Sequence, residues 1–280
     1  MAINKIVSIC IPAYNNEKYI SKTINSVLGQ TYQDFEIIIS DDASKDRTIE
    51  IAKSFNDSRI KIFNNGINLG LTTNWNRSIE LAQGDYIKLV CGDDIIYPTC
   101  IEKQVKVLDN DINFSIALVT SCSHVINSID KVIFKRKNIF KPGINNPQKV
   151  IKRCLQIGTN LIGEPMVGMF RRSILREDMK YDGSNPYLID LDFWFKLLQK
   201  GNLYTINDYL SAFRISSGTL SASLNIRQFI LFKDFIKLQH QKKTINAVDL
   251  QIGIINAFLV SLIRNFIFYY IIQKDSKIKI

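Results

Sequence analysis

Two kinds of pattern alternate along the first hundred residues, and this alternation constrains the fold more than any other feature of the chain. Short apolar runs rich in β-branched residues are typical of buried strands, and segments with apolar residues at helical spacing separate them. Such an alternation predicts a parallel sheet covered by helices on both faces. The predicted strands are residues 5–12, 35–44, 59–66 and 85–94, and the predicted helices are residues 17–30, 46–55 and 70–84.

Polar side chains follow each predicted strand at the point where it ends. In parallel sheets, ligands bind in the crevice at the carboxyl ends of the strands. Two of the four ends carry adjacent carboxylates, which repel each other unless a cation or a ligand hydroxyl lies between them. We therefore expect a ligand site here. For the second pair, capping of a following helix remains an alternative. The strand-end residues are Pro12, Ala13, Tyr14 and Asn15, then Asp41 and Asp42, then Asn64, Asn65 and Asn68, and finally Asp93 and Asp94.

The patterns are weaker after residue 110. We expect strands at residues 114–126 and 131–137, a loop at 140–150, and a turn followed by an apolar strand within 160–175. Residues 185–201 predict a helix with Asp190 and Asp192 near its start.

The charge and the cysteines narrow the function classes. A net charge of +10 suits anionic partners such as nucleotide diphosphates or acidic lipid head groups. It suits nucleic acid too, but the clustered carboxylates would repel a phosphate backbone, so we expect no nucleic acid. The five cysteines form no C-x-x-C pair and lie mostly in apolar surroundings, which favours a reduced, cytoplasmic protein.

Residues 221–280 form a basic and apolar tail with helical patterns. Residues 254–272 are long enough to span a bilayer, but Asn256, Arg264 and Asn265 interrupt the stretch, and a central arginine is costly in a membrane. We expect this segment to bind peripherally to an anionic membrane surface. A helical bundle covering the sheet and a homo-oligomer interface stay open as alternatives.

Four stretches of the chain resemble the inverting glycosyltransferases of family 2, which have the GT-A fold. They are residues 7–48, 68–98, 163–175 and 188–198, and the first two are specific as a pair. The resemblance implies an α/β, Rossmann-like, mostly parallel sheet flanked by helices, to which the helical pattern of the tail adds a C-terminal helical extension. It implies a glycosyltransferase domain at residues 1–220, divided into a nucleotide-sugar half (1–100) and an acceptor half (101–220). The tail at residues 221–280 is a separate expectation from its apolar and basic pattern.

The resemblance also implies a donor site at the strand ends. Tyr14 would stack on the base, and Asp42 would accept a hydrogen bond from the base imide, which favours a UDP- or dTDP-sugar. Asp41 would be structural or lie at the ribose. The other donor-binding residues implied are Pro12, Ala13, Asn15, Asn68, Asn76, Asp93 and Arg214.

A divalent metal ion is implied by the family's D-x-D signature. The matching residues here are Cys91, Gly92 and Asp93, so the first aspartate is missing. Asp93 would hold Mg²⁺ or Mn²⁺ against the diphosphate, with help from Asp94 unless that residue caps a helix. The ion would act as a Lewis acid for the departing nucleotide.

The acceptor half would supply a general base. Asp190 matches the family's base, with Asp192 as the alternative, and Glu164 would face the acceptor. The implied reaction is transfer by single displacement to a hydroxyl of a lipid-linked glycan. It would serve bacterial O-antigen, capsule or cell-wall assembly at the inner face of the cytoplasmic membrane. A non-catalytic member of the same fold and a nucleotidyltransferase are the alternatives.

Overall fold

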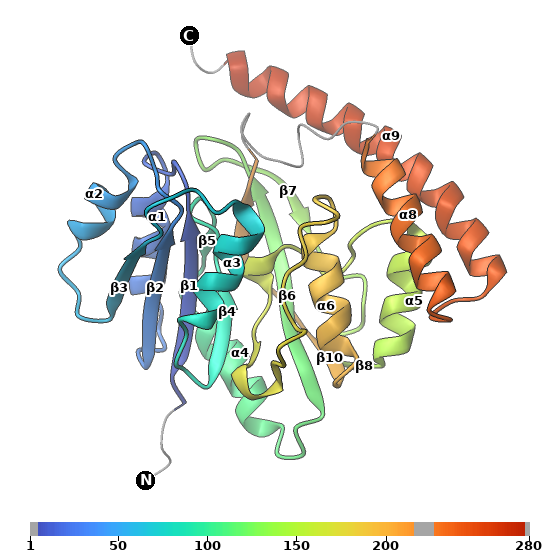
Figure 1. Ribbon diagram of the computed structural model, residues 1–280, viewed down its shortest axis with the longest axis horizontal. Helices are drawn as coiled ribbons and strands as arrows, with labels where there is room; N and C mark the ends of the chain where they lie inside the picture. Colours follow the sequence, from blue (N-terminus) through green and yellow to red (C-terminus); the bar gives the residue numbers. More distant parts are fainter. Residues whose placement is uncertain (1–4, 216–226, 278–280) are drawn as a thin grey trace.

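The chain folds as two β-sheets surrounded by helices, in a computed structural model that describes residues 5–215 and 227–277 (Figure 1). The first sheet, sheet A, contains the four predicted strands in the order β3-β2-β1-β4, all parallel. A short fifth strand, β9, pairs antiparallel with β4 at the edge. The bounds are β1 (Val7–Ala13), β2 (Phe35–Asp41), β3 (Ile60–Asn64), β4 (Tyr86–Leu89) and β9 (Phe170–Arg171).

Helices cover both faces of sheet A, as predicted. Successive side chains of a strand point to opposite faces, and β1 follows this rule. Ile9 and Ile11 belong to the same core cluster as Ile24 of α1, whereas Cys10 belongs to a second cluster with Trp75 of α3. The helices are α1 (Ile20–Leu28), α2 (Thr48–Lys53) and α3 (Leu71–Glu80).

The second sheet, sheet B, differs from the prediction because it contains a long strand that the sequence did not reveal. This strand, β10 (Asn202–Arg214), pairs parallel with β6. Its sequence contains Asn207 and Asp208, which are typical of a turn, but the structure accommodates them in a shift of register between Ile206 and Tyr209. The other strands of sheet B are β5 (Ile95–Ile96), β6 (Ile116–Ile126), β7 (Val132–Arg136) and β8 (Gly143–Asn145).

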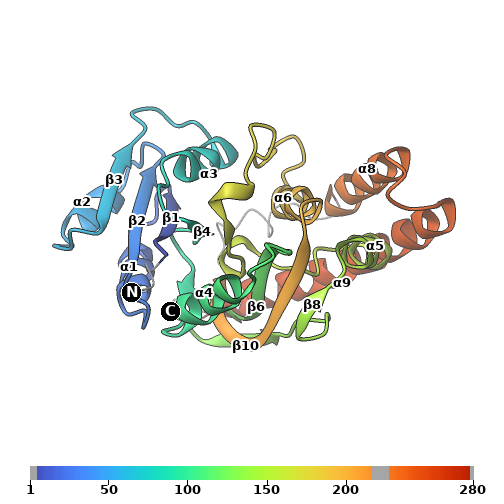
Figure 2. The same cartoon turned by 90° about the horizontal axis from the view of Figure 1, so that it is seen from below.

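Helices of the second half lie around sheet B (Figure 2). The predicted loop at 140–150 ends in a helix, whose first turn is capped because Lys149 N donates to Asn146 Oδ1 at 3.1 Å. The expected strand within 160–175 is only the two residues of β9, set between two 3₁₀ turns. The elements are α4 (Cys100–Asn110), α5 (Pro147–Ile157), α6 (Ile189–Leu198), η1 (Pro165–Val167) and η2 (Arg172–Ile174).

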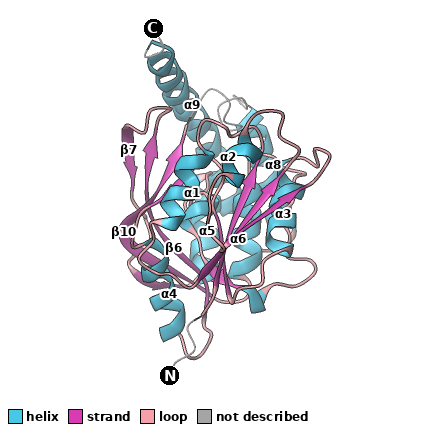
Figure 3. Cartoon of the chain, turned by 90° about the vertical axis from the view of Figure 1, so that its left-hand side faces the viewer, coloured by secondary structure: helices cyan, strands magenta, loops and turns pink. Residues whose placement is uncertain are grey.

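The tail contains two helices, α8 (Arg227–Gln241) and α9 (Ala247–Lys277), and the boundary expected at residue 220 lies outside the described residues. Helix α9 runs past α5 and α8 (Figures 1 and 3). The approach is very close, since a Cβ added at Gly158 would lie 2.3 Å from Ala257 N, and one added at Gly253 would lie 2.4 Å from Leu155 O. The first half of α9 is therefore packed against the body of the protein.

Candidate active site

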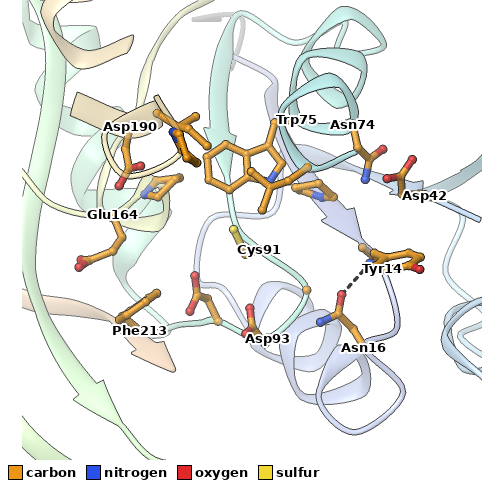
Figure 4. A pocket seen from close by; sticks show the side chains of 18 of the residues that line it. Tyr14, Asn16, Asp42, Asn74, Trp75, Cys91, Asp93, Glu164, Asp190 and Phe213 are labelled. Atoms are coloured by element: carbon orange, nitrogen blue, oxygen red, sulfur yellow. Dashed lines mark hydrogen bonds between the residues drawn. The ribbon is translucent and has the colours of Figure 1, made fainter. Parts of the chain in front are cut away.

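A cavity of about 480 Å³ opens at the carboxyl ends of β1, β2 and β4, where the sequence predicts a ligand site. Residues of the later turn before η1, of α6 and of α9 complete its wall. Tyr14 and Asp42 lie on one side of the cavity and Glu164 and Asp190 on the other, with Asp93 between them (Figure 4). The predicted site residues that line it are Pro12, Ala13, Tyr14, Asp42, Asn68, Asp93, Asp94, Glu164 and Asp190.

We call Tyr14, Asn16, Asp42 and Asn68 the Asp42 side of the cavity. Asn16 was not predicted, yet it lines the cavity, and its Oδ1 accepts a hydrogen bond from Tyr14 N at 2.9 Å. Its neighbour Asn15, which was predicted, has a φ of 53° and bonds through Oδ1 to Lys45 N at 2.8 Å, outside the cavity wall. Asparagine tolerates this left-handed conformation, so Asn15 makes the turn and Asn16 faces the cavity.

The Asp42 carboxylate is held by its own chain. Its Oδ1 accepts from Leu69 N at 2.7 Å and from Asn65 Nδ2 at 3.0 Å, and its Oδ2 accepts from Gly70 N at 3.0 Å. A carboxylate oxygen has two lone pairs, so Oδ2 retains one for a ligand. The Asn68 side chain donates to Asp42 O at 3.3 Å and thereby closes the same loop.

Two other predicted donor residues have internal partners instead of a place in the cavity wall. Asp41 is fully buried and accepts from Ser44 N at 3.0 Å. Asn76 bonds to the backbone of Tyr181 in both directions, at 2.8 and 2.9 Å. Asp41 thus holds the turn that follows β2, and Asn76 ties α3 to the loop at Tyr181.

Asp93 and Asp94 follow β4 and lie in the middle of the cavity wall. Asp94 does not cap a helix, because β5 follows it and α4 begins only at Cys100, after Thr99. Burial raises the pKa of both carboxyls, and the charge of Asp93 raises that of Asp94 further. Asp94 Oδ1 accepts from Arg214 N at 3.0 Å, whereas its buried Oδ2 has no hydrogen-bond partner in the structure.

Arg214, predicted to bind the donor, is fully buried and lies outside the cavity wall. Its Nε donates to Asp93 O at 2.8 Å and its Nη1 to Asn127 O at 2.8 Å, while Nη2 lies 2.6 Å from Asp130 Oδ1. The side chain therefore orients the loop that carries Asp93 and Asp94.

Asp190 lines the cavity and Asp192 does not. Two residues apart on a helix, side chains point in nearly opposite directions, and Asp192 pairs with Lys196 at 2.7 Å instead. Burial raises the pKa of Asp190 to about 6, although the positive charges of Arg136 and Arg264 act to lower it. A carboxyl with such a pKa is mostly ionised at neutral pH and is still basic enough to accept a proton.

We call Arg136, Asn160, Glu164, Asp190 and Arg264 the Asp190 side of the cavity. Arg136 forms an ion pair with Glu164 and donates through Nη2 to Asn160 O at 2.8 Å. Arg264 reaches the cavity from α9 and lies over the Tyr187 ring, with Cζ 5.4 Å from its centroid. Sequence reasoning missed Arg136, Asn160 and Arg264 as site residues.

A signal for Arg264 was present in the helical spacing of the tail. Gly253, Ala257 and Ser261 are buried at intervals of four residues, and Arg264 continues the same face. Because the same arginine interrupts the apolar stretch of residues 254–272, its place on the buried face is easily overlooked. No comparable signal exists for Arg136, which sits in a run of basic residues.

The residues around Asp93 fit a hard divalent cation, although the described residues contain no group of three or more His, Cys, Asp or Glu side chains that could hold a metal ion by themselves. Mg²⁺ is commonly held by one or two carboxylates together with substrate phosphates. Asp93 lines the cavity, and the neighbouring Asp94 has a buried oxygen without a partner.

Comparison with known proteins decides the family. The model of glycosyl transferase family 2 matches residues 8–178, which is more than half of the chain. The chain belongs to this family. It is accordingly a glycosyltransferase, and the alternation of strands and helices in residues 8–94 lies wholly inside the matched region.

Two relatives cover most of the chain. An uncharacterized glycosyltransferase of Haemophilus influenzae is 29% identical, over 98% of this chain and 83% of that protein. The Escherichia coli protein WfgD, named as a UDP-Glc:α-D-GlcNAc-diphosphoundecaprenol β-1,3-glucosyltransferase, is 28% identical, over 83% of this chain and 87% of its own length.

Solved structures share the GT-A fold. Staphylococcus aureus TarS 1–349 in complex with UDP-GlcNAc has a TM-score of 0.63 at 19% identity, and the match covers 83% of this chain but only 66% of that one. A mannosyltransferase from Pyrobaculum calidifontis in complex with GDP-Man and Mn²⁺ has a TM-score of 0.64 at 14% identity, over 93% of this chain and 74% of that one. The predicted fold class is confirmed.

Proposed function

We propose that this glycosyltransferase moves a sugar from a UDP- or dTDP-sugar to a hydroxyl of a glycan acceptor, with inversion at the anomeric carbon. One observation carries the proposal: a single cavity has a carboxyl suited to act as a base, Asp190, on one side and Asp42 on the other, with Asp93 between them. A cavity of about 480 Å³ is within the range of small-molecule sites.

The donor nucleotide would lie on the Asp42 side. Tyr14 is 46% exposed and can stack on a base, while the free lone pair of Asp42 Oδ2 can accept a hydrogen bond from a base imide N–H. Uracil and thymine carry that N–H. The names of WfgD and TarS mention UDP-sugars, which supports uracil, whereas the mannosyltransferase was solved with a guanine nucleotide.

The diphosphate would lie at Asp93. Asp93 would hold Mg²⁺ or Mn²⁺, with Asp94 as a second carboxylate, and the bound ion would supply Lewis-acid stabilisation of the leaving diphosphate. Arg214 would keep the two carboxylates in place from behind, through Asp93 O and Asp94 Oδ1.

The acceptor hydroxyl would lie on the Asp190 side. Asp190 would take the hydroxyl proton as the oxygen attacks the anomeric carbon from the face opposite the diphosphate, and a single displacement of this kind inverts the configuration. Asn160 Nδ2 lies 3.5 Å from Asp190 Oδ2 and helps to orient the base. Glu164, paired with Arg136, would face the acceptor.

The acceptor would be a lipid-linked glycan of bacterial polysaccharide assembly, as the name of WfgD suggests for that relative. The outer face of α9 supports this proposal, because it exposes apolar side chains that no described element covers. Their exposed fractions are 60% for Ile255, 49% for Leu259, 60% for Ile263 and 74% for Phe266. A contiguous apolar face of this kind marks an interaction site.

We propose that this face binds the cytoplasmic side of an anionic membrane. Among the described residues, Ala247–Phe266 is long and apolar enough to span a bilayer. Spanning would pull Ala257 away from Gly158 and remove Arg264 from the cavity wall. Peripheral binding preserves both features. The tail also exposes Lys237, Lys242 and Lys243, and a lysine that lies at the membrane surface adds attraction of about 1 kcal/mol.

Vesicle sedimentation tests the membrane proposal. Ile263→Glu should lose binding to phosphatidylglycerol vesicles, whereas Ile112→Glu, at a residue 83% exposed after α4, should bind like the wild type. Equal binding by both variants would mean that α9 does not contact the membrane.

Calorimetry tests the donor proposal. UDP and TDP should bind in the presence of Mn²⁺ and more weakly without it, GDP should bind less well than either, and Asp93→Asn should abolish the effect of the metal ion. Failure of all three nucleotides to bind would instead favour a non-catalytic member of the family.

A further inference from the structure

The Asp190 side of the cavity contains two arginines that the reaction as proposed does not use. Arg136 comes from β7 and Arg264 from α9, and both line the cavity. Burial lowers the pKa of Arg136 to about 10, and the charge of Arg264 contributes to this shift. Two cations placed together in a partly buried site repel each other, so their juxtaposition needs a compensating anion.

Two carboxylates on the Asp190 side compensate these charges, and one of them loses its charge during the reaction as proposed. Glu164 forms an ion pair with Arg136, and the Asp190 carboxylate feels both arginines. These four side chains sum to zero charge while Asp190 is ionised. Once Asp190 has taken a proton from the acceptor, the group carries one net positive charge, and an anion on the acceptor would balance it.

Arg264 is also placed between the cavity and the apolar face of α9. It lies over Tyr187 at the cavity wall, and the adjacent Ile263 is 60% exposed on the outer face. A molecule with a phosphate between a sugar and a lipid could therefore contact Arg264 through the phosphate, place its sugar toward Asp190 and lay its lipid along α9.

We propose that Arg264, together with Arg136, binds a phosphate group of the acceptor. The inference rests on the proposed function, because it identifies the chemical class of the acceptor at the same site. The ligand is a phosphate or diphosphate ester, whether its ester partner is a lipid or a sugar. Arginine suits this role because its planar guanidinium donates two parallel hydrogen bonds to phosphate oxygens.

Calorimetry with the full chain can test this subsite without knowledge of the natural acceptor. The probes are geranyl diphosphate, geraniol and N-acetylglucosamine 1-phosphate, titrated in EDTA so that no metal ion can bind a phosphate at Asp93. The variants are Arg264→Gln, Arg264→Lys and, as a matched control, Arg153→Gln at an exposed residue of α5.

We expect Arg264→Gln to weaken binding of geranyl diphosphate at least tenfold, the change expected when a hydrogen bond to a charged group is lost. Arg264→Lys should recover most of the affinity, and Arg153→Gln should equal the wild type. Unchanged affinity in Arg264→Gln would overturn the proposal and leave Arg264 with the role of stabilising the Asp190 carboxylate.

Wild-type protein alone provides a second test, which holds even if the Arg264 variants fail to fold. Geranyl diphosphate should bind at least tenfold more tightly than geraniol, and equal affinities would overturn the proposal. Stronger binding of the sugar phosphate than of geranyl diphosphate, lost in Arg264→Gln, would support the phosphate subsite and assign the phosphate to a sugar instead of a lipid.

Failure here is distinguishable from failure of the proposed function. Metal-dependent binding of UDP and its loss in Asp93→Asn do not involve Arg264, so they can hold when the phosphate subsite does not.

Discussion

The two sides of the cavity are built in different ways. On the Asp42 side, each lining residue directly follows a strand of one parallel sheet or lies in the adjoining loop, all within the first 68 residues. The Asp190 side is assembled from β7, the turn before η1, α6 and α9, between residues 136 and 264. The first construction is local and repeats one rule of α/β folds, whereas the second depends on how distant helices pack.

This difference suggests that the two sides can be damaged separately. Variants on the Asp190 side should reduce transfer while nucleotide binding persists, whereas variants on the Asp42 side should weaken nucleotide binding itself.

Asp190→Asn is expected to have the largest effect. Loss of the base should lower the rate of transfer on the order of 10²- to 10⁴-fold, with the UDP dissociation constant unchanged. Asp192→Asn is the matched control, because Asp192 lies on the same helix but outside the cavity. Single-turnover assays with a radiolabelled donor measure the rate, and a greater loss in Asp192→Asn would show that the base has been misassigned.

Gly158→Ala should disturb the Asp190 side from a distance. Gly158 has a φ of 82°, and its new Cβ would lie 2.3 Å from Ala257 N, so α9 would have to shift and carry Arg264 with it. We expect a loss of about 2–4 kcal/mol in the free energy of unfolding, from backbone strain and overpacking together.

The matched control is Gly143→Ala, which has a φ of 93° but nothing within 4 Å of the new Cβ. It should cost only the strain, about 1 kcal/mol. Chemical denaturation measures both values. Equal losses in the two variants would contradict the tight docking of α9.

Gly92→Ala should damage the Asp42 side. Its Cβ would lie 2.7 Å from Asn16 Oδ1, which accepts the hydrogen bond from Tyr14 N. Because that bond contributes about 0.5–1.5 kcal/mol, we expect UDP affinity to fall by about threefold to tenfold. Asn16→Ala should have a similar effect, and the double variant should be no worse than either. Additive losses measured by calorimetry would mean that Gly92 acts by another route.

The pH dependence of transfer should show the smallest change. Since Asp190 must be ionised to accept a proton, the rate should fall as the pH drops below about 6, the pKa set by its burial. Arg264→Gln removes a cation that favours the carboxylate, so the pKa should rise and the acid limb should move to higher pH. A limb that stays in place would show that Arg264 does not influence the base.

Prediction from sequence succeeded where local patterns determine structure. The parallel strands β1 to β4, the helices between them and α6 were expected, as was a cavity at the strand ends. It was less successful for single side chains. Asn15 and Asn16 are adjacent and chemically identical, and only the φ of 53° at Asn15 decides which of them faces the cavity. Arg214 has the right charge for a diphosphate but is buried behind Asp93.

The sequence by itself determined that sheet A is parallel and that carboxylates gather at its edge, because buried strands and helices carry periodic apolar patterns and parallel strands end at one edge. Tertiary structure alone decided how buried charges find partners and which distant residues complete the cavity. Lys88, in an apolar strand, is fully buried because Gln104 Oε1 and Met166 O accept hydrogen bonds from its ammonium at 2.9 and 2.6 Å. Likewise, Arg264 lies in the cavity wall because Gly158 and Gly253 let α9 approach. The spacing of buried residues in the tail marks one face of α9, but it does not reveal what that face packs against.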